Sequence, residues 1–106
     1  MMMMNLALEW GRYGIRVNSI VPGPIEGTEG LKRLSSAEAR QSLIDAVPLR
    51  RVGTVDDIGQ TAAFLASPLA SYISGCVVIC DGGSNLAGSG RFNATAEQML
   101  KAETKP

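Results

Sequence analysis

The fold is decided by a stretch that is rich in β-branched residues and ends in a proline–glycine–proline run: Ile15-Arg16-Val17-Asn18-Ser19-Ile20-Val21-Pro22-Gly23-Pro24. Such a composition predicts a strand over Ile15 to Val21. Because proline cannot donate to a strand ladder, the strand should end ahead of Pro22. A second strand is predicted over Cys76 to Cys80, where every residue is apolar. Continuous apolar strands are typical of a parallel sheet that helices cover on both faces.

Helical segments separate these two strands. A capping signal, in which Ser or Thr is followed three residues later by an acid, occurs at Ser35 with Glu38 and at Thr54 with Asp57. The two signals predict helices over residues 36–46 and 55–66. A strand, a helical crossover and a second strand make a βαβ unit. Because a sheet usually has about four to six strands, we expect an α/β chain that is the final βαβ part of a larger doubly wound parallel sheet, and therefore an incomplete domain.

Composition and charge exclude several classes of function. The chain has 106 residues, with ten Lys and Arg, ten Asp and Glu, and no histidine. A net charge of zero gives no reason to expect nucleic acid or an anionic membrane as a partner. The lack of histidine excludes Ser-His-Asp catalysis and most zinc sites, and we expect no metal. No apolar run reaches the roughly 18 residues that cross a bilayer.

The two cysteines and the two ends of the chain allow three further expectations. Cys76 and Cys80 would lie roughly 13 Å apart along a strand, which is too far for a disulfide, so we expect two small buried side chains. Four successive methionines followed by apolar residues at helical spacing indicate an internal helix over Met1 to Trp10, and we expect the chain to be a fragment. We divide it into residues 1–83 and a tail, 84–106, with a short helix near 95–102.

One loop is the best candidate for a ligand site. In an open parallel sheet, ligands bind beyond the carboxyl ends of the strands. The segment from Pro22 to Thr28 follows the first strand, and its prolines and glycines would let backbone N–H groups approach a polar ligand closely. The Thr28 hydroxyl can both donate and accept. Prolines and glycines also commonly end a strand and begin a loop without binding anything. The pattern by itself leaves both interpretations open, a ligand site and an ordinary strand end.

Other polar groups have plainer interpretations. The basic pairs Lys32-Arg33 and Arg50-Arg51 are either solvated surface or groups that hold a phosphate. The adjacent acids at 56 and 57 suit the positive N-terminus of a helix better than acid–base catalysis. No G-x-G-x-x-G can be drawn through the glycines that follow the second strand, so Gly82 and Gly83 are expected to form a turn that Asp81 caps.

Short sequence motifs spread over residues 5–83 resemble the C-terminal part of the short-chain dehydrogenase/reductase family. They are Leu6-Ala7-Leu8-Glu9-Trp10-Gly11, Gly14-Ile15-Arg16-Val17-Asn18-Ser19, Pro22-Gly23-Pro24-Ile25, Phe64-Leu65-Ala66-Ser67, Tyr72-Ile73-Ser74-Gly75 and Val78-Ile79-Cys80-Asp81-Gly82-Gly83. Within the family, the segment from Pro22 to Leu34 is similar to the 2,4-dienoyl-CoA reductases, particularly the peroxisomal type. Many other members carry Ile-x-Thr after Pro-Gly, whereas the residues from Ile25 to Thr28 include one more.

The resemblance implies a Rossmann-type sheet with NADPH over its carboxyl edge. The residues that it implies for cofactor binding are Pro22, Gly23, Pro24, Ile25, Glu26, Gly27 and Thr28, with the Ile25 N–H and the Thr28 hydroxyl on the carboxamide. Arg33 corresponds to a basic position that touches the acyl-CoA substrate. The family's glycine-rich turn, catalytic acid and lysine precede the helix with which this chain starts, so no catalytic residue is assigned here.

The implied activity is the NADPH-dependent reduction of 2,4-dienoyl-CoA to 3-enoyl-CoA in fatty-acid β-oxidation, as part of a full-length homo-oligomeric enzyme, either a dimer or a tetramer. The 106-residue stretch alone is expected to be inactive. One alternative is another member of the family, such as a 3-oxoacyl carrier-protein reductase or a sugar or alcohol dehydrogenase. A second is a non-catalytic chain that assembles only with full-length subunits. The expected location is a bacterial cytoplasm or a peroxisome, although Thr104-Lys105-Pro106 departs from the Ser-Lys-Leu type of signal.

Overall fold

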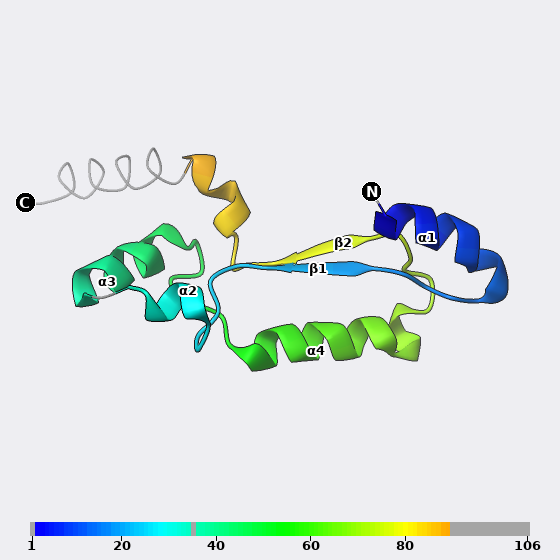
Figure 1. The fold of residues 1–106 in the computed structure, drawn as a ribbon, viewed down its shortest axis with the longest axis horizontal. Helices are drawn as coiled ribbons and strands as arrows, with labels where there is room; N and C mark the ends of the chain where they lie inside the picture. The colour runs from blue at the N-terminus through cyan, green and yellow to red at the C-terminus, as the bar shows by residue number, and fades with distance from the viewer. Residues whose placement is uncertain (1, 35, 90–106) are drawn as a thin grey trace, which may run out of the picture.

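A two-stranded parallel sheet lies at the centre of the computed structural model, which describes residues 2–34 and 36–89 (Figure 1). Strand β1 (Ser19–Pro22) pairs along its whole length with β2 (Val77–Cys80). The helices are α1 (Met2–Trp10), α2 (Glu29–Lys32), α3 (Ala37–Ala46) and α4 (Val55–Ala66), with 3₁₀ turns at Gly11–Tyr13, Pro68–Ala70 and Ser84–Ser89. The predicted βαβ unit with parallel strands is therefore confirmed.

Both strands start later than the sequence predicts. Strand β1 starts at Ser19 rather than Ile15, and β2 starts one residue later than expected. The reason lies in the chain ahead of β2, which turns instead of extending. Val17 is therefore bonded to that turn: its N–H donates to Ser74 Oγ (3.2 Å) and its carbonyl accepts from Gly75 N (2.7 Å).

Strand β1 also ends one residue later than predicted, because Pro22 belongs to it. Pro22 lies opposite Cys80, and the ladder at this point uses the N–H of the next residue, Gly23, which donates to the Cys80 carbonyl (3.2 Å). The N–H that proline lacks is therefore not needed at this position.

The cap of α3 differs from the prediction by one residue. Ser36 is the N-cap, and its Oγ accepts from Ala39 N (3.0 Å). Glu38 then lies only two residues beyond the cap, whereas a capping box needs three. The predicted box of Ser35 with Glu38 is therefore wrong, although the helix itself is present.

Arg16 joins the chain ahead of β1 to the end of α4. Its Nη1 donates to the Leu65 carbonyl (2.6 Å) and the Ala70 carbonyl (2.9 Å), and its Nη2 donates to the Ser67 carbonyl (3.4 Å). The last carbonyls of a helix have no partner within the helix, so a guanidinium is well suited to them. This contact fixes the far end of α4 relative to the sheet.

Burial in the sheet is lower than the apolar strands predict. Helix α4 runs along the sheet and packs against both strands (Figure 1). Val21 and Ile79 nevertheless remain 46% exposed, so the expected burial of the strands on both faces is not found among these residues. Among the described residues, the buried apolar side chains all lie outside the strands and are Ile25, Leu31, Val47, Leu65 and Ala70.

Both cysteines are free, as expected, but Cys76 is exposed rather than buried and Cys80 is partly buried. In the described part of the chain, no helix is both long enough and apolar enough to span a membrane. The helix predicted near residues 95–102 lies outside the described residues.

Candidate functional site

The loop that follows β1 is anchored to the segment ahead of α4. Ile25 and Gly53 form an isolated parallel bridge, in which Gly53 N donates to the Pro24 carbonyl (2.9 Å) and Glu26 N donates to the Gly53 carbonyl (2.8 Å). Ile25 is only 7% exposed, so its side chain secures the loop as well. The loop therefore has a defined position at the carboxyl end of β1.

Within the loop, the Ile25 carbonyl accepts two hydrogen bonds, whereas the Ile25 N–H donates none to a described residue. The Ile25 carbonyl accepts from Thr28 Oγ1 (2.8 Å) and from Thr28 N (3.4 Å). Gly27 has a φ of +83°, a conformation that favours glycine and lets the chain turn back at this point. The Ile25 N–H makes no hydrogen bond to another described residue. The loop thus offers one unpaired donor, and Thr28 Oγ1 keeps lone pairs that can accept a further hydrogen bond.

The first residues of the predicted segment have structural partners. A Cβ on Gly23 would lie 2.5 Å from Asp81 Cβ and 2.8 Å from Asp81 Cα, so only glycine lets the two strand ends approach so closely. The Glu26 carboxylate forms an ion pair with Arg40 of α3 (2.5 Å). Pro22 and Gly23 therefore belong to the sheet, whereas the segment from Ile25 to Thr28 forms the loop proper.

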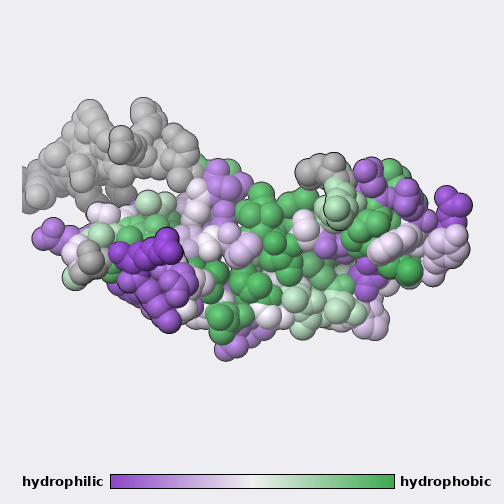
Figure 2. All heavy atoms as spheres, viewed as in Figure 1, coloured by the Kyte–Doolittle hydropathy of each residue, from purple (hydrophilic) through white to green (hydrophobic). Residues whose placement is uncertain are grey.

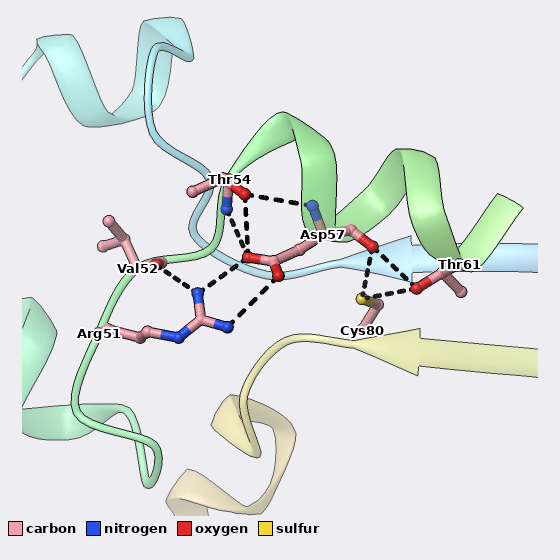
Figure 3. Close-up of polar contacts among 6 residues, drawn as sticks. All are labelled: Arg51, Val52, Thr54, Asp57, Thr61 and Cys80. Atoms are coloured by element: carbon pink, nitrogen blue, oxygen red, sulfur yellow. Dashed lines mark hydrogen bonds and ion pairs between the residues drawn. The ribbon is translucent and has the colours of Figure 1, made fainter. Parts of the chain in front are cut away.

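Arg51, Thr54 and Asp57 form a polar cluster at the start of α4 (Figure 3). Arg51 Nη1 and Nη2 donate to the two oxygens of Asp57 (2.8 and 3.3 Å). Thr54 N donates to Asp57 Oδ2 (2.8 Å), and Asp57 N donates to Thr54 Oγ1 (3.1 Å). The Arg51 guanidinium, followed by the Thr54 N–H, holds the pKa of the Asp57 carboxyl well below its usual range. The predicted helix-capping role of Thr54 and Asp57 is confirmed.

The two basic pairs differ in how their side chains are used. The Arg51 guanidinium is engaged by Asp57, and the Arg50 guanidinium donates to the Asp45 carbonyl. Arg33 lies at the C-cap of α2, and its exposed guanidinium makes no hydrogen bond or ion pair with another residue of the described part. Figure 2 shows hydrophilic residues gathered at the end of the molecule where Figure 1 places α2 and α3. Arg33 is therefore the better candidate for an anionic ligand.

The turn after β2 has the predicted form. Asp81 Oδ1 accepts from Gly83 N (2.9 Å) and Asp81 Oδ2 from Asn85 N (2.7 Å), so this carboxylate caps the turn. The turn also receives the end of the α3 segment, because Leu49 N donates to the Gly82 carbonyl (3.1 Å).

A cleft of about 700 Å³ opens between the end of β2 and the start of α4. Its walls include Ile25, Leu49, Gly53, Gln60, Phe64 and Ile79. Neither Thr28 nor Arg33 lines it, so the predicted ligand loop meets this cleft only through its first residues. In the part of the chain that the structure describes, no group of three or more Cys, Asp or Glu side chains could hold a metal ion.

Sequence reasoning missed Gly53 and Arg40, which hold the loop in place. Their partners lie far along the chain, and the only local signal is a glycine directly ahead of the Thr54 cap.

Comparison with known proteins places these features in a family. Residues 1–85 match the family model described as enoyl-(acyl carrier protein) reductase. The peroxisomal 2,4-dienoyl-CoA reductase of Mus musculus is 51% identical over 101 residues, which cover 94% of this chain and 33% of that protein. The protein of the same name from Pongo abelii is 52% identical over 81 residues (76% and 28%). A Bacillus subtilis protein named as a probable 2,4-dienoyl-CoA reductase, (2E)-enoyl-CoA-producing, is 51% identical over 80 residues (74% and 32%).

Solved structures agree with this assignment. A short chain dehydrogenase from Bacillus anthracis superimposes with a TM-score of 0.68 at 47% identity, over 79% of this chain and 32% of that one. An NADPH-dependent reductase involved in bacilysin biosynthesis gives 0.71 at 31% identity, over 78% and 35%. The chain spans about a third of the length of the relatives it matches. It therefore belongs to the short-chain dehydrogenase/reductase family, in which it resembles the 2,4-dienoyl-CoA reductases and carries a βαβ part of their Rossmann-type α/β fold.

Proposed function

We propose that these residues supply the nicotinamide-side loop, and part of the acyl-CoA site, of an NADPH-dependent 2,4-dienoyl-CoA reductase of fatty-acid β-oxidation. Identities of about one half to proteins of that name support the proposal. A related structure is named an NADPH-dependent reductase, and another contains NADH. The observation that carries the proposal is the Ile25 N–H. This group lies beside the carboxyl end of β1 and makes no hydrogen bond to a described residue.

The loop fits a nicotinamide carboxamide, which presents one carbonyl and one NH₂ group. The Ile25 N–H can donate to the carbonyl. Thr28 Oγ1 donates its hydrogen bond to the Ile25 carbonyl, so its lone pairs remain able to accept a hydrogen bond from the NH₂ group. No atom lies within 4 Å of a Cβ placed on Gly27, so the turn of the loop is open on that side. When bound, the cofactor supplies the hydride for the reduction.

The substrate end of the site is proposed for Arg33. Acyl-CoA carries several phosphate charges, and a guanidinium binds phosphate in a bidentate manner that lysine cannot reproduce. The Glu26–Arg40 ion pair ties α3, which follows Arg33 along the chain, to the cofactor loop. No residue of this stretch is proposed as the proton donor for the reduction.

We also propose that the full-length protein is a homo-oligomer and that it is located in a bacterial cytoplasm or a peroxisome.

The proposal is tested in a full-length reductase that contains this segment, called the complete enzyme below. It is obtained by replacing the matching part of the Mus musculus relative, whose alignment covers 94% of this chain, with residues 1–85. We expect NADPH to be consumed with a 2,4-dienoyl-CoA, and NMR of the product to show a 3-enoyl-CoA. Turnover of a 3-oxoacyl carrier protein or a sugar alcohol in preference to the dienoyl-CoA would contradict the proposal. A 2-enoyl product would correct only its regiochemistry.

A further inference from the structure

Gly53 occupies a position where the space, and not the backbone conformation, requires glycine. Its φ is not positive, so its backbone would accept any L-residue. A Cβ built on it would lie 2.8 Å from Ile25 Cδ1 and 3.6 Å from both the Pro24 carbonyl oxygen and Asp57 Oδ2. The first of these distances is shorter than real carbon contacts. Gly53 therefore lets Ile25 lie directly against the backbone.

The bridge to Gly53 also decides which way the Ile25 N–H faces. In a parallel bridge, Gly53 bonds to the residues on either side of Ile25, namely the Pro24 carbonyl and the Glu26 N–H. The N–H and carbonyl of Ile25 then face away from Gly53. The carbonyl accepts from Thr28, and the N–H has no described partner. The backbone bonds to Gly53 thus set the orientation of this N–H, and any shift of the Ile25 backbone relative to Gly53 would move it.

The two sides of this contact differ, and the Ile25 side is the one that must yield. On the far side of Gly53, Asp57 Oδ2 is held by Arg51 (2.8 Å) and by Thr54 N (2.8 Å). On the near side, the atom that the new Cβ would strike is Cδ1, the end of the Ile25 side chain, and this side chain is 7% exposed and borders the cleft. An added methyl group on Gly53 must therefore move Ile25, either by an off-rotamer side chain or by a shift of the loop backbone.

We propose that Gly53 is a positioning residue for the nicotinamide cofactor, because its bare backbone seats Ile25 so that the Ile25 N–H meets the carboxamide. This role rests on the proposed function, since it assumes that the loop binds the cofactor.

The test measures the dissociation constant of NADPH by fluorescence titration of the complete enzyme without substrate, and the KM for dienoyl-CoA in separate assays. Gly53→Ala is expected to weaken NADPH binding about threefold to tenfold, the size of an off-rotamer cost, and to leave the KM for dienoyl-CoA nearly unchanged. The matched control is Gly59→Ala in α4, where no atom lies within 4 Å of the new Cβ. This control should bind NADPH normally.

A rescue experiment separates positioning from general damage. Ile25→Val removes the Cδ1 atom that the new methyl group would strike. In the Ile25→Val background, Gly53→Ala should therefore cost less than twofold in NADPH affinity. Failure of this rescue, or equal affinities for Gly53→Ala and Gly59→Ala, would overturn the positioning role alone. If the unsubstituted complete enzyme bound neither NADPH nor NADH, the proposed function and this role would both be wrong.

Discussion

Thr28 has one hydroxyl, which supports the loop and for which we also propose a contact with the cofactor. Its Oγ1 donates to the Ile25 carbonyl at 2.8 Å. In the complete enzyme, Thr28→Val should therefore lose both the loop bond and an acceptor for the carboxamide. We expect NADPH affinity to fall by about 1–3 kcal/mol, the cost of leaving a polar partner unpaired. Thr28→Ser, which keeps the hydroxyl, should restore most of the affinity in the same titration. An unchanged dissociation constant for Thr28→Val would show that the hydroxyl only shapes the loop.

Arg33 and its neighbour Lys32 provide a matched pair for the substrate side. Both are exposed at the end of α2, and neither forms an ion pair with another described residue. Arg33→Ala in the complete enzyme should raise the KM for dienoyl-CoA several-fold and leave the NADPH constant unchanged, because a bidentate phosphate contact is lost. Lys32→Ala should have little effect. If a short thioester without the CoA nucleotide suffers equally from Arg33→Ala, Arg33 acts on the acyl chain or the loop instead.

The glycines of the loop after β1 show how far the sequence could predict the site. The segment from Pro22 to Thr28 was identified as a unit, but its glycines serve different purposes. Gly27 is needed for its positive φ, whereas Gly23 is needed because Asp81 approaches its backbone. The second cause depends on a residue 58 positions away, which no local pattern contains.

Among the elements, α4 was predicted with the correct bounds because its signals are local. Thr54 and Asp57 cap its start, and Ser67-Pro68 ends it. The predicted start of β1 is four residues too early. The sequence does not show this, because the true start depends on where β2 begins to run beside β1. Arg16 had no recognisable role in the sequence for the same reason, since the carbonyls that it binds are about fifty residues away.

The cap of α4 has a testable pH dependence. Arg51 and the Thr54 N–H lower the pKa of Asp57 in the folded state. The unfolded carboxyl titrates at about 3.9, so the stabilisation is complete above that pH and is lost as the pH falls further. In the complete enzyme, Asp57→Asn should lower the unfolding temperature near neutral pH, and the difference from wild type should shrink below about pH 4. Asp56→Asn is the control, because Asp56 forms no ion pair with another described residue. A difference that stays constant with pH would contradict this account.

On the scale of the whole molecule, the chain has little core of its own. Among the described residues, Val47 is the largest side chain that is fully buried, while Leu69 and Tyr72 are 83% and 102% exposed. Small domains are stable only if they bury most of their apolar surface. We therefore expect residues 1–106, expressed alone, to unfold without a sharp transition in circular dichroism and to show no NADPH-dependent turnover of dienoyl-CoA. A cooperative thermal transition together with turnover would contradict this prediction.

The attachment of α2 and α3 has a consequence for engineering. This segment begins after the Ile25–Gly53 bridge and ends where Val47 lies against Gly82, so that both of its ends lie beside the strand ends and the start of α4. Residues 29–46 can therefore be treated as an exchangeable cassette. Grafting the equivalent cassette from a relative with another acyl preference, together with a matching partner for Glu26, should transplant substrate range while cofactor affinity stays with the recipient.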